Sequence, residues 1–270
     1  MDLFNSVINA VLRGFFAAFS WAPPIVGLAV LSVLVGIGML WVYRKTSDQE
    51  KIRSVKRRLH ALLLELRVYA DEPGVTLRTQ GSLLAANLRY MGLALRPALW
   101  MALPVAILLV HLEGFYGRAP LTPGREAIVT AALPAGTAGS VPELLPPPGV
   151  ELSAPPVRIL DQGEVSWRIK PLGTVSGQLR FRTGSGTIEK TIEAGGRPRL
   201  IAGKRVRTVF SAFWHPDEPR LESDDVEWVE IRYPDADVGL GKLRMNWLLW
   251  FVIISMLAAL ALRKRFHVSI

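Results

Sequence analysis

Three stretches of the chain are apolar without interruption and contain no Asp, Glu, Lys or Arg: residues 25–43, 97–112 and 247–262. A helix needs about 20 apolar residues to cross a hydrocarbon core of about 30 Å. The first stretch reaches this length, and the other two fall about one turn short. With their flanking residues, we predict transmembrane helices at residues 24–43, 97–113 and 246–262. The alternative for the shorter two is a buried core helix of a soluble domain.

The first 22 residues show a helical pattern of hydrophobic positions. Apolar residues recur at spacings of three and four between Leu3 and Phe19, while Asn5, Asn9 and Arg13 lie on the opposite face. This pattern is typical of a helix that lies in the membrane interface. We therefore predict a retained amphipathic helix on the outer leaflet over residues 1–22. The alternative is a fourth membrane span.

Residues 44–96 carry two further apolar series with a heptad-like spacing. The first series runs from Ile52 to Tyr69, and 71–74 (Asp-Glu-Pro-Gly) is a turn signal. The second series comprises Leu77, Leu84, Leu88, Met91 and Leu95. Two facing seams joined by a short turn predict an antiparallel coiled-coil hairpin. If its first arm, residues 44–70, were one straight helix, that arm would project roughly 40 Å.

Residues 117–244 change to the alternating pattern of half-buried strands. Strands are predicted at residues 164–172, 178–183, 187–193, 205–213 and 226–233, and 184–186 (Gly-Ser-Gly) is predicted to be a hairpin loop. The proline-rich residues 142–156 are predicted to be a linker or an edge strand, because proline cannot serve a central ladder. The fold class is therefore an α-helical membrane protein with an inserted, extracytoplasmic all-β sandwich of roughly immunoglobulin type.

The net charge of +9 is concentrated in two segments. Residues 44–96 carry 11 Lys and Arg against 5 Asp and Glu, the tail 263–270 adds three basic residues, and residues 113–244 balance at 17 against 17. Three spans place the two basic segments on one side, which the positive-inside rule makes cytoplasmic. We expect a multi-pass protein of the inner (plasma) membrane whose N-terminus and residues 113–244 lie outside the cytoplasm. The lipid bilayer is the expected partner, and specific nucleic acid is not.

Candidate chemistry is sparse. The chain has no cysteine and no HExxH, GxSxG or Walker motif, so we expect no enzyme activity, no cofactor and no metal. His215, Asp217 and Glu218 are the best candidates for a metal cluster, but a solvated loop is the favoured interpretation. Trp167, Trp214 and Trp228 are expected in the core or an interface.

The order of these elements resembles that of a known family. An outer interfacial helix, a span, a basic hairpin and a return span that contains Pro104 follow one another, and the approach to that span is residues 88–97. Residues 1–116 and the final span are thereby similar to the YidC/Oxa membrane-insertase superfamily, in the three-span form of its shorter members. One departure is that no predicted span carries a charged residue, whereas bacterial members have a positive residue near the position of Gly36.

The resemblance implies a non-enzymatic insertase or chaperone that helps membrane helices to insert or fold. Its partners would be nascent or substrate membrane proteins and a ribosome or other subunits of a membrane complex. Docking would use hairpin residues Arg53, Lys56, Arg57 and Arg58. The hydrophobic slide would comprise Leu99, Pro104, Leu108, Trp250, Ile253 and Met256. A hydrophilic groove would be lined by Ser32, Gly36, Gly38, His111, Asn246 and Ser255.

Two blander interpretations stay open at the level of sequence. The basic hairpin residues are equally well explained as a solvated face that only fixes topology, and the slide residues as surface that faces lipid or packs. In the rival function, the spans merely anchor a scaffold or binding protein, whose β domain captures an envelope partner.

Overall fold

The computed structural model describes residues 1–69, 71–134, 141–196, 200–240, 243–263 and 265–266. The chain forms two compact units. The first unit contains Met1–Gly27 and Leu108–Trp247, and the second unit contains Leu28–Ile107 and Leu248–Ile270. Ala70, the predicted end of the first hairpin arm, and most of the predicted basic tail lie outside the described residues.

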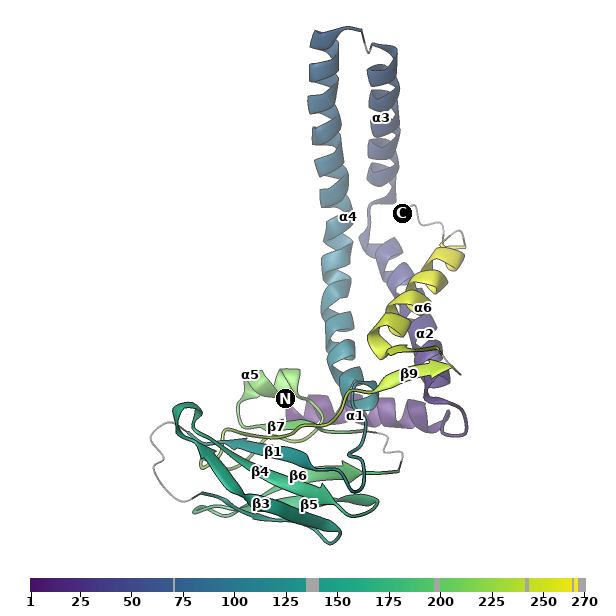
Figure 1. Cartoon of the computed structure of the whole chain (residues 1–270). Coiled ribbons are helices and arrows are strands. Elements are labelled where there is room, and N and C mark those ends of the chain that lie inside the picture. The colour runs from purple at the N-terminus through teal and green to yellow at the C-terminus, as the bar shows by residue number, and fades with distance from the viewer. Residues whose placement is uncertain (70, 135–140, 197–199, 241–242, 264, 267–270) are drawn as a thin grey trace. The chain divides into compact units, whose positions relative to one another are not determined.

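Two of the described helices are long and apolar enough to cross a membrane: α2 (Pro24–Thr46), with 23 residues, and α4 (Pro73–Tyr116), with 44. The apolar helix α6 (Trp247–Leu262) has 16 residues, or about 24 Å of helix, which is short of a full crossing. The described helices, drawn in Figure 1, are α1 (Asp2–Ala17), α2 (Pro24–Thr46), α3 (Gln49–Val68), α4 (Pro73–Tyr116), α5 (Val209–Trp214), α6 (Trp247–Leu262) and the short 3-10 helix η1 (Leu160–Gln162).

The first hairpin arm is not one straight helix from residue 44. Instead, α2 ends at Thr46 and α3 begins at Gln49. Asp48 caps α3, because its side chain accepts a hydrogen bond of 3.1 Å from the backbone N–H of Lys51. A side-chain acceptor at this position satisfies one of the free N–H groups of a helix start. The local capping signal therefore separates α2 from α3.

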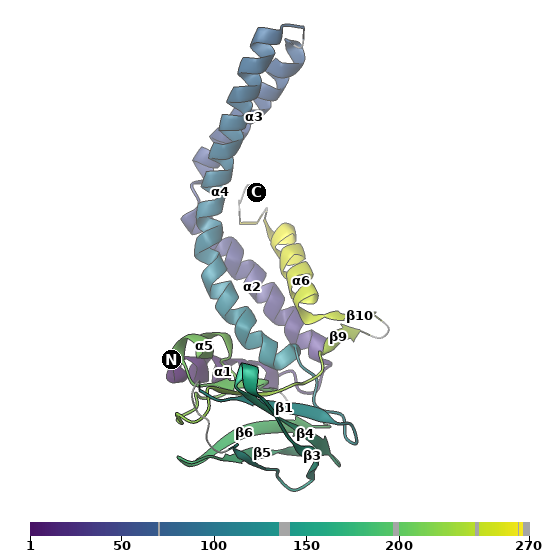
Figure 2. The same ribbon diagram turned by 60° about the vertical axis from the view of Figure 1, so that its left-hand side comes forward.

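The second hairpin arm and the second apolar stretch form the single helix α4, with Pro97 and Pro104 inside it. Figures 1 and 2 show α3 and α4 running side by side. Thr79 and Ala86 are the buried positions on this part of α4, and on α3 they are Ile52 and Val55. The prediction for the second seam is wrong: Leu77, Leu84, Leu88, Met91 and Leu95 are each more than half exposed. The buried positions of this arm are therefore Thr79 and Ala86, and not the leucines.

The first unit contains an antiparallel β domain with two main sheets. The larger sheet has the order β3-β4-β1-β8-β7, the smaller has the order β2-β5-β6, and β9 and β10 form a separate pair. The strands are β1 (Ala127–Ala132), β2 (Glu143–Leu145), β3 (Val150–Ile159), β4 (Glu164–Pro171), β5 (Val175–Arg182), β6 (Thr187–Ala194), β7 (Lys204–Val206), β8 (Trp228–Ile231), β9 (Asp237–Leu240) and β10 (Leu243–Asn246).

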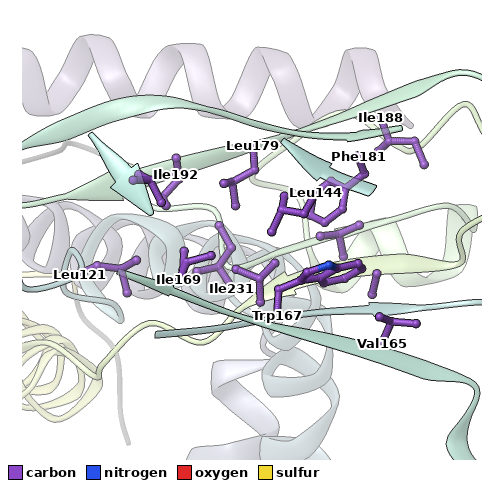
Figure 3. Close-up of a cluster of buried hydrophobic side chains, with 14 of the residues drawn as sticks. Leu121, Leu144, Val165, Trp167, Ile169, Leu179, Phe181, Ile188, Ile192 and Ile231 are labelled. Carbon is purple, nitrogen blue, oxygen red and sulfur yellow. The ribbon is translucent and has the colours of Figure 1, made fainter. Parts of the chain in front are cut away.

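The two main sheets share one hydrophobic core, shown in Figure 3. The larger sheet contributes Trp167 and Ile169, and the smaller contributes Leu179 and Phe181. The rings of Trp167 and Phe181 meet edge to face, with centroids 5.4 Å apart. Buried aromatic pairs of this geometry are worth about 1 kcal/mol beyond their area. This core holds the two main sheets together as one β domain, to which the other elements of the first unit attach.

Three of the five predicted strands are confirmed in β4, β5 and β6, and the hairpin loop at residues 184–186 is confirmed by the hydrogen bond of 2.8 Å from Thr183 N–H to Gly186 O. The strand predicted at 226–233 shortens to β8. The strand predicted at 205–213 is wrong, because only β7 is extended and helix α5 follows it. The sequence prediction missed β1, β9 and β10.

The proline-rich residues 142–156 take part in two edge strands, so the prediction of an edge strand is confirmed and that of a linker is wrong. β2 lies at the edge of the smaller sheet and β3 at the edge of the larger. β3 contains Pro155 and Pro156, and its pairing with β4 shifts register between Leu152 and Val157. Proline is tolerated here because an edge strand has a side without ladder hydrogen bonds.

Candidate functional site

A continuous apolar face on α4 stands out in the second unit. We call it the α4 stripe, and it comprises Leu84, Leu88, Met91, Leu95, Leu99 and Leu103. Spacings of three and four place these residues on one side of the helix. Each of them is more than half exposed. In a soluble setting, an exposed apolar patch of this kind marks an interaction surface.

A shallow groove of about 410 Å³ lies along the stripe. Leu95, Leu99 and Leu103 line it together with Trp100 and Arg96, and Gly92 forms the remaining part of its wall. The Trp100 side chain is 72% exposed. The groove therefore combines apolar walls with one cation at its rim.

The predicted docking residues lie on α3. Arg53, Arg57 and Arg58 are exposed, and Lys56 is half-buried. The Lys56 ammonium lies 5.5 Å from the centre of the Tyr90 ring on α4, within the range of a cation–π contact. An open concavity of about 730 Å³ is lined by Arg53, Lys56 and Arg57 and by Glu50, Lys51 and Ser54. Three of the four residues are thus available to an anionic partner.

The predicted slide residues divide between two helices. On α4, Leu99 and Pro104 are exposed and Leu108 is half-buried. On α6, Ile253 and Met256 are exposed and Trp250 is half-buried. Pro104 follows the last leucine of the stripe and lies inside α4 without ending it.

The predicted groove residues have several different environments. Ser32 is buried, and its hydroxyl donates a hydrogen bond of 2.7 Å to Leu28 O in its own helix. Gly36 packs against α6, because a Cβ there would lie 2.6 Å from the backbone oxygen of Ser255. The Ser255 hydroxyl donates to Val252 O, again within its own helix. The other three predicted residues are not part of the contact between Gly36 and Ser255. Gly38 has open space around it, His111 is buried, and Asn246 is exposed at the end of β10.

The first unit holds a buried charge cluster that sequence reasoning missed. The Lys190 side chain is fully buried, and its ammonium donates hydrogen bonds of 2.6 Å to Glu218 Oε2 and to Ala202 O. The second oxygen of Glu218 accepts from the backbone N–H of Thr191 at 2.9 Å. A buried ion pair persists only when such additional hydrogen bonds satisfy its polar atoms. The signal was present in β6, where Lys190 falls in phase with the buried Ile188 and Ile192.

A second pair, Arg118 and Asp217, adjoins the first. Their closest charged atoms are 3.8 Å apart, and the Asp217 side chain is only 5% exposed. Burial raises the pKa of Asp217 to about 7, against the opposing effect of Arg118. Burial likewise lowers the pKa of Lys190, against the attraction of Glu218. The favoured sequence interpretation of residues 215–218 as a solvated loop is therefore wrong for Asp217. Among the described residues, no group of three His, Cys, Asp or Glu residues is placed to hold a metal.

Glycines make room for this cluster at the end of α4. A Cβ on Gly114 would collide with Asp217 Oδ1, and one on Gly203 would collide with the Arg118 guanidinium. The backbone of Gly114 also accepts a hydrogen bond of 2.8 Å from Ile201 N–H. The last turn of α4 is thereby fastened directly to the β domain.

The polar face of α1 is fastened to the same domain. The side-chain amide of Asn5 donates to Ala212 O at 3.1 Å, that of Asn9 donates to Pro216 O at 2.8 Å, and Asp2 forms a 3.1 Å ion pair with Arg220. A cleft of about 470 Å³ remains between α1 and residues 216–219. The exposed face of α1 is the apolar one, with Leu3, Phe4, Val7 and Val11.

The structure defines a mixed class of protein, in which a helical part with two long apolar helices is joined to an antiparallel β domain. No protein-family model, no curated protein and no solved structure matches the chain. The immunoglobulin type and the superfamily resemblance therefore stay predictions.

Proposed function

We propose that this protein is a multi-pass protein of the inner membrane that assists the insertion or folding of membrane helices, and that the α4 stripe receives the incoming helix. The α4 stripe carries the proposal. It is exposed along its whole length, and only 6% of the most apolar window of α4 is buried by the rest of the chain.

Lipid alone does not account for the whole stripe. Leu84 precedes the apolar stretch that begins at residue 97 by 13 residues, which is roughly 20 Å of helix. In the proposed topology, Leu84, Leu88 and Met91 therefore stand in the cytoplasm. Each leucine gains about 1.5–3 kcal/mol when a partner buries it fully. A transient apolar partner, such as a membrane helix on its way to the bilayer, fits a surface that begins in water and continues into lipid.

The charge distribution supports the proposed orientation. The hairpin has an excess of six positive charges, since it carries 11 Lys and Arg against 5 Asp and Glu. Such a segment is retained on the cytoplasmic side. Arg53, Arg57 and Arg58 are exposed on α3. They are placed to attract anionic lipid headgroups or ribosomal RNA, and this attraction would keep the carrier of the substrate near the stripe.

Photo-crosslinking to a ribosome-bound nascent membrane helix tests the proposal. Probes are placed at Leu88 and Leu99 on the stripe, and the matched control probe replaces Arg89, which is exposed on the same turn but off the stripe. We expect crosslinks at Leu88 and Leu99 and not at Arg89. A nascent chain with a polar segment in place of its apolar helix should lose them. Equal crosslinking at all three positions would refute the assignment of the stripe.

A second experiment distinguishes docking of the ribosome at the basic residues from binding of the incoming helix at the α4 stripe. Exchanging Arg53, Lys56, Arg57 and Arg58 for Gln should lower the crosslinking of ribosome-bound chains. Released chains presented in detergent should crosslink as before, because the stripe itself is unchanged. Loss of both signals would show that the basic residues maintain the hairpin rather than dock a carrier.

A second candidate function, an envelope scaffold, is favoured by the edge strand β3. Its outer residues include Leu152, Val157 and Ile159, and Leu160 follows at 76% exposure. An apolar sheet edge can bind a partner, although Pro155 and Pro156 limit the addition of a strand. Replacing Leu152 and Val157 by Lys should abolish capture of an envelope partner by the full chain if the scaffold function is the real one. Crosslinking at Leu88 should not change.

A further inference from the structure

We infer that the β domain itself rests on the bilayer, through a composite apolar surface formed by α1 and α5, and that lipid is what covers this surface. The inference rests on the membrane location in the proposed function. It assigns a membrane contact to α5, a segment that the sequence pattern predicted to be part of a strand at residues 205–213.

The first observation is the apolar face of α5. At 100° per residue, Val209, Phe210, Phe213 and Trp214 fall on one arc of this helix, and Ala212 falls on the other side. Phe210 is 78% exposed, and Val209 and Trp214 are each about half exposed, whereas Ala212 is buried. None of the four arc residues is charged. Thr208 starts the helix, because its hydroxyl accepts a hydrogen bond from Ser211 N–H at 3.3 Å.

The second observation is that α5 is joined to α1. The carbonyl of the buried Ala212 accepts the hydrogen bond from the Asn5 amide, so α5 and α1 are in contact at this point. Figures 1 and 2 both show α5 beside the N-terminal half of α1, on the same side of the β sheets. Leu3 and Phe4, from the first turn of α1, are exposed at 79% and 46%. Exposed apolar residues of both helices therefore lie within one turn of this contact.

The third observation selects lipid as the partner. The Phe16 ring of α1 contacts Phe115 and Tyr116 in the last turn of α4, with centroids 5.1 Å and 5.2 Å apart. This fastens α1 at the level where an apolar helix ends, which is the interface if α4 crosses the bilayer. Helices with bulky apolar residues on one face and polar anchors on the other lie in that plane, and Trp and Phe favour it. Here Asn5, Asn9 and Asp2 on the polar side are bound to the β domain, and the apolar side is exposed.

Spin labels measure the depth of the surface in the intact protein. The chain contains no cysteine, so single substitutions label one site each in protein reconstituted into lipid nanodiscs. The test sites are Phe210→Cys and Trp214→Cys, and Leu3→Cys reports on α1. The matched control is Leu172→Cys, since Leu172 is 55% exposed, close to the 52% of Trp214. Leu172 lies beside β3, at the sheet edge opposite β7 and α5.

We expect the labels at residues 3, 210 and 214 to collide more often with oxygen, which concentrates in lipid, than with a water-soluble nickel chelate. The label at residue 172 should show the reverse order. If residues 210 and 214 behave like residue 172 while residue 3 remains in lipid, the inference fails and the interfacial position of α1 stands. Spin–spin broadening at residue 210 would overturn it in favour of a second copy of the chain. If every label is in water but Leu88 still crosslinks to nascent helices, the inference fails and the proposed function stands.

Discussion

Replacing the buried Lys190 by Met should destabilise the β domain far more than the loss of any exposed ion pair. The substitution removes the cation from Glu218, whose side chain is 10% exposed, and takes away the donor that Ala202 O receives at 2.6 Å. A carboxylate left buried without its partner costs about 3–5 kcal/mol. For a unit of this size, the loss corresponds to a fall of roughly 10–15 °C in the unfolding temperature.

The matched control is Arg180→Met on the neighbouring strand β5. Arg180 pairs with Glu189 at 3.4 Å, but the two side chains are 62% and 43% exposed. An exposed pair contributes at most about 1 kcal/mol, so this variant should unfold within a few degrees of the wild type. Thermal unfolding of the full chain in detergent, followed by near-ultraviolet circular dichroism, provides the comparison.

The double variant Lys190→Met with Glu218→Met removes both charges and should recover most of the lost stability, because no uncompensated charge is left in the core. The reasoning is refuted if Lys190→Met and Arg180→Met lower the unfolding temperature equally. It is also refuted if the double variant unfolds at a lower temperature than Lys190→Met alone.

Two further predictions concern single contacts. The pKa of Asp217 is raised from 3.8 to about 7, so the folded state holds this proton more tightly than the unfolded state, and stability should fall as the pH rises from about 4 to about 7. The unfolding temperature of the wild type relative to Asp217→Asn should therefore drop between pH 5 and pH 8; a constant difference would contradict the burial of this carboxyl group. Gly36→Ala places a Cβ 2.6 Å from Ser255 O and should destabilise the α2–α6 contact by about 1–3 kcal/mol, whereas Gly38→Ala, with open space, should be neutral or slightly stabilising in the same unfolding assay.

The sequence predicted the elements whose pattern is local. The apolar run of α2 and the alternation in β4, β5 and β6 need no partner to be recognised. The alternation in residues 205–213 was misleading, because Thr208 is also a helix-capping residue and its hydrogen bond to Ser211 outweighed the strand pattern. β1 was missed although it is the centre of the larger sheet, since its short, alanine-rich sequence carries little strand signal.

The candidate sites were harder to predict, because they depend on which surfaces meet. The sequence pattern placed the leucines of α4 on one face, but it did not show that Thr79 and Ala86 would be buried while this face stays exposed. The Lys190–Glu218 pair joins residues 28 positions apart, and a one-dimensional pattern does not show such a partner. The one signal in the sequence was the alternation of β6, which places Lys190 on the same buried face as its isoleucines.

The fastening of α1 to the β domain has a consequence for the timing of biogenesis. Asn5 and Ala212 are 207 positions apart, and Asp2 and Arg220 are 218 positions apart. At about 5–20 residues per second, roughly 10–40 s of synthesis separate the two halves of each contact. For that interval the polar side of α1 lacks its partner groups, so the nascent helix must wait in another environment. Helix α1 is made long before the residues that it binds, so it is among the last segments to reach its final contacts.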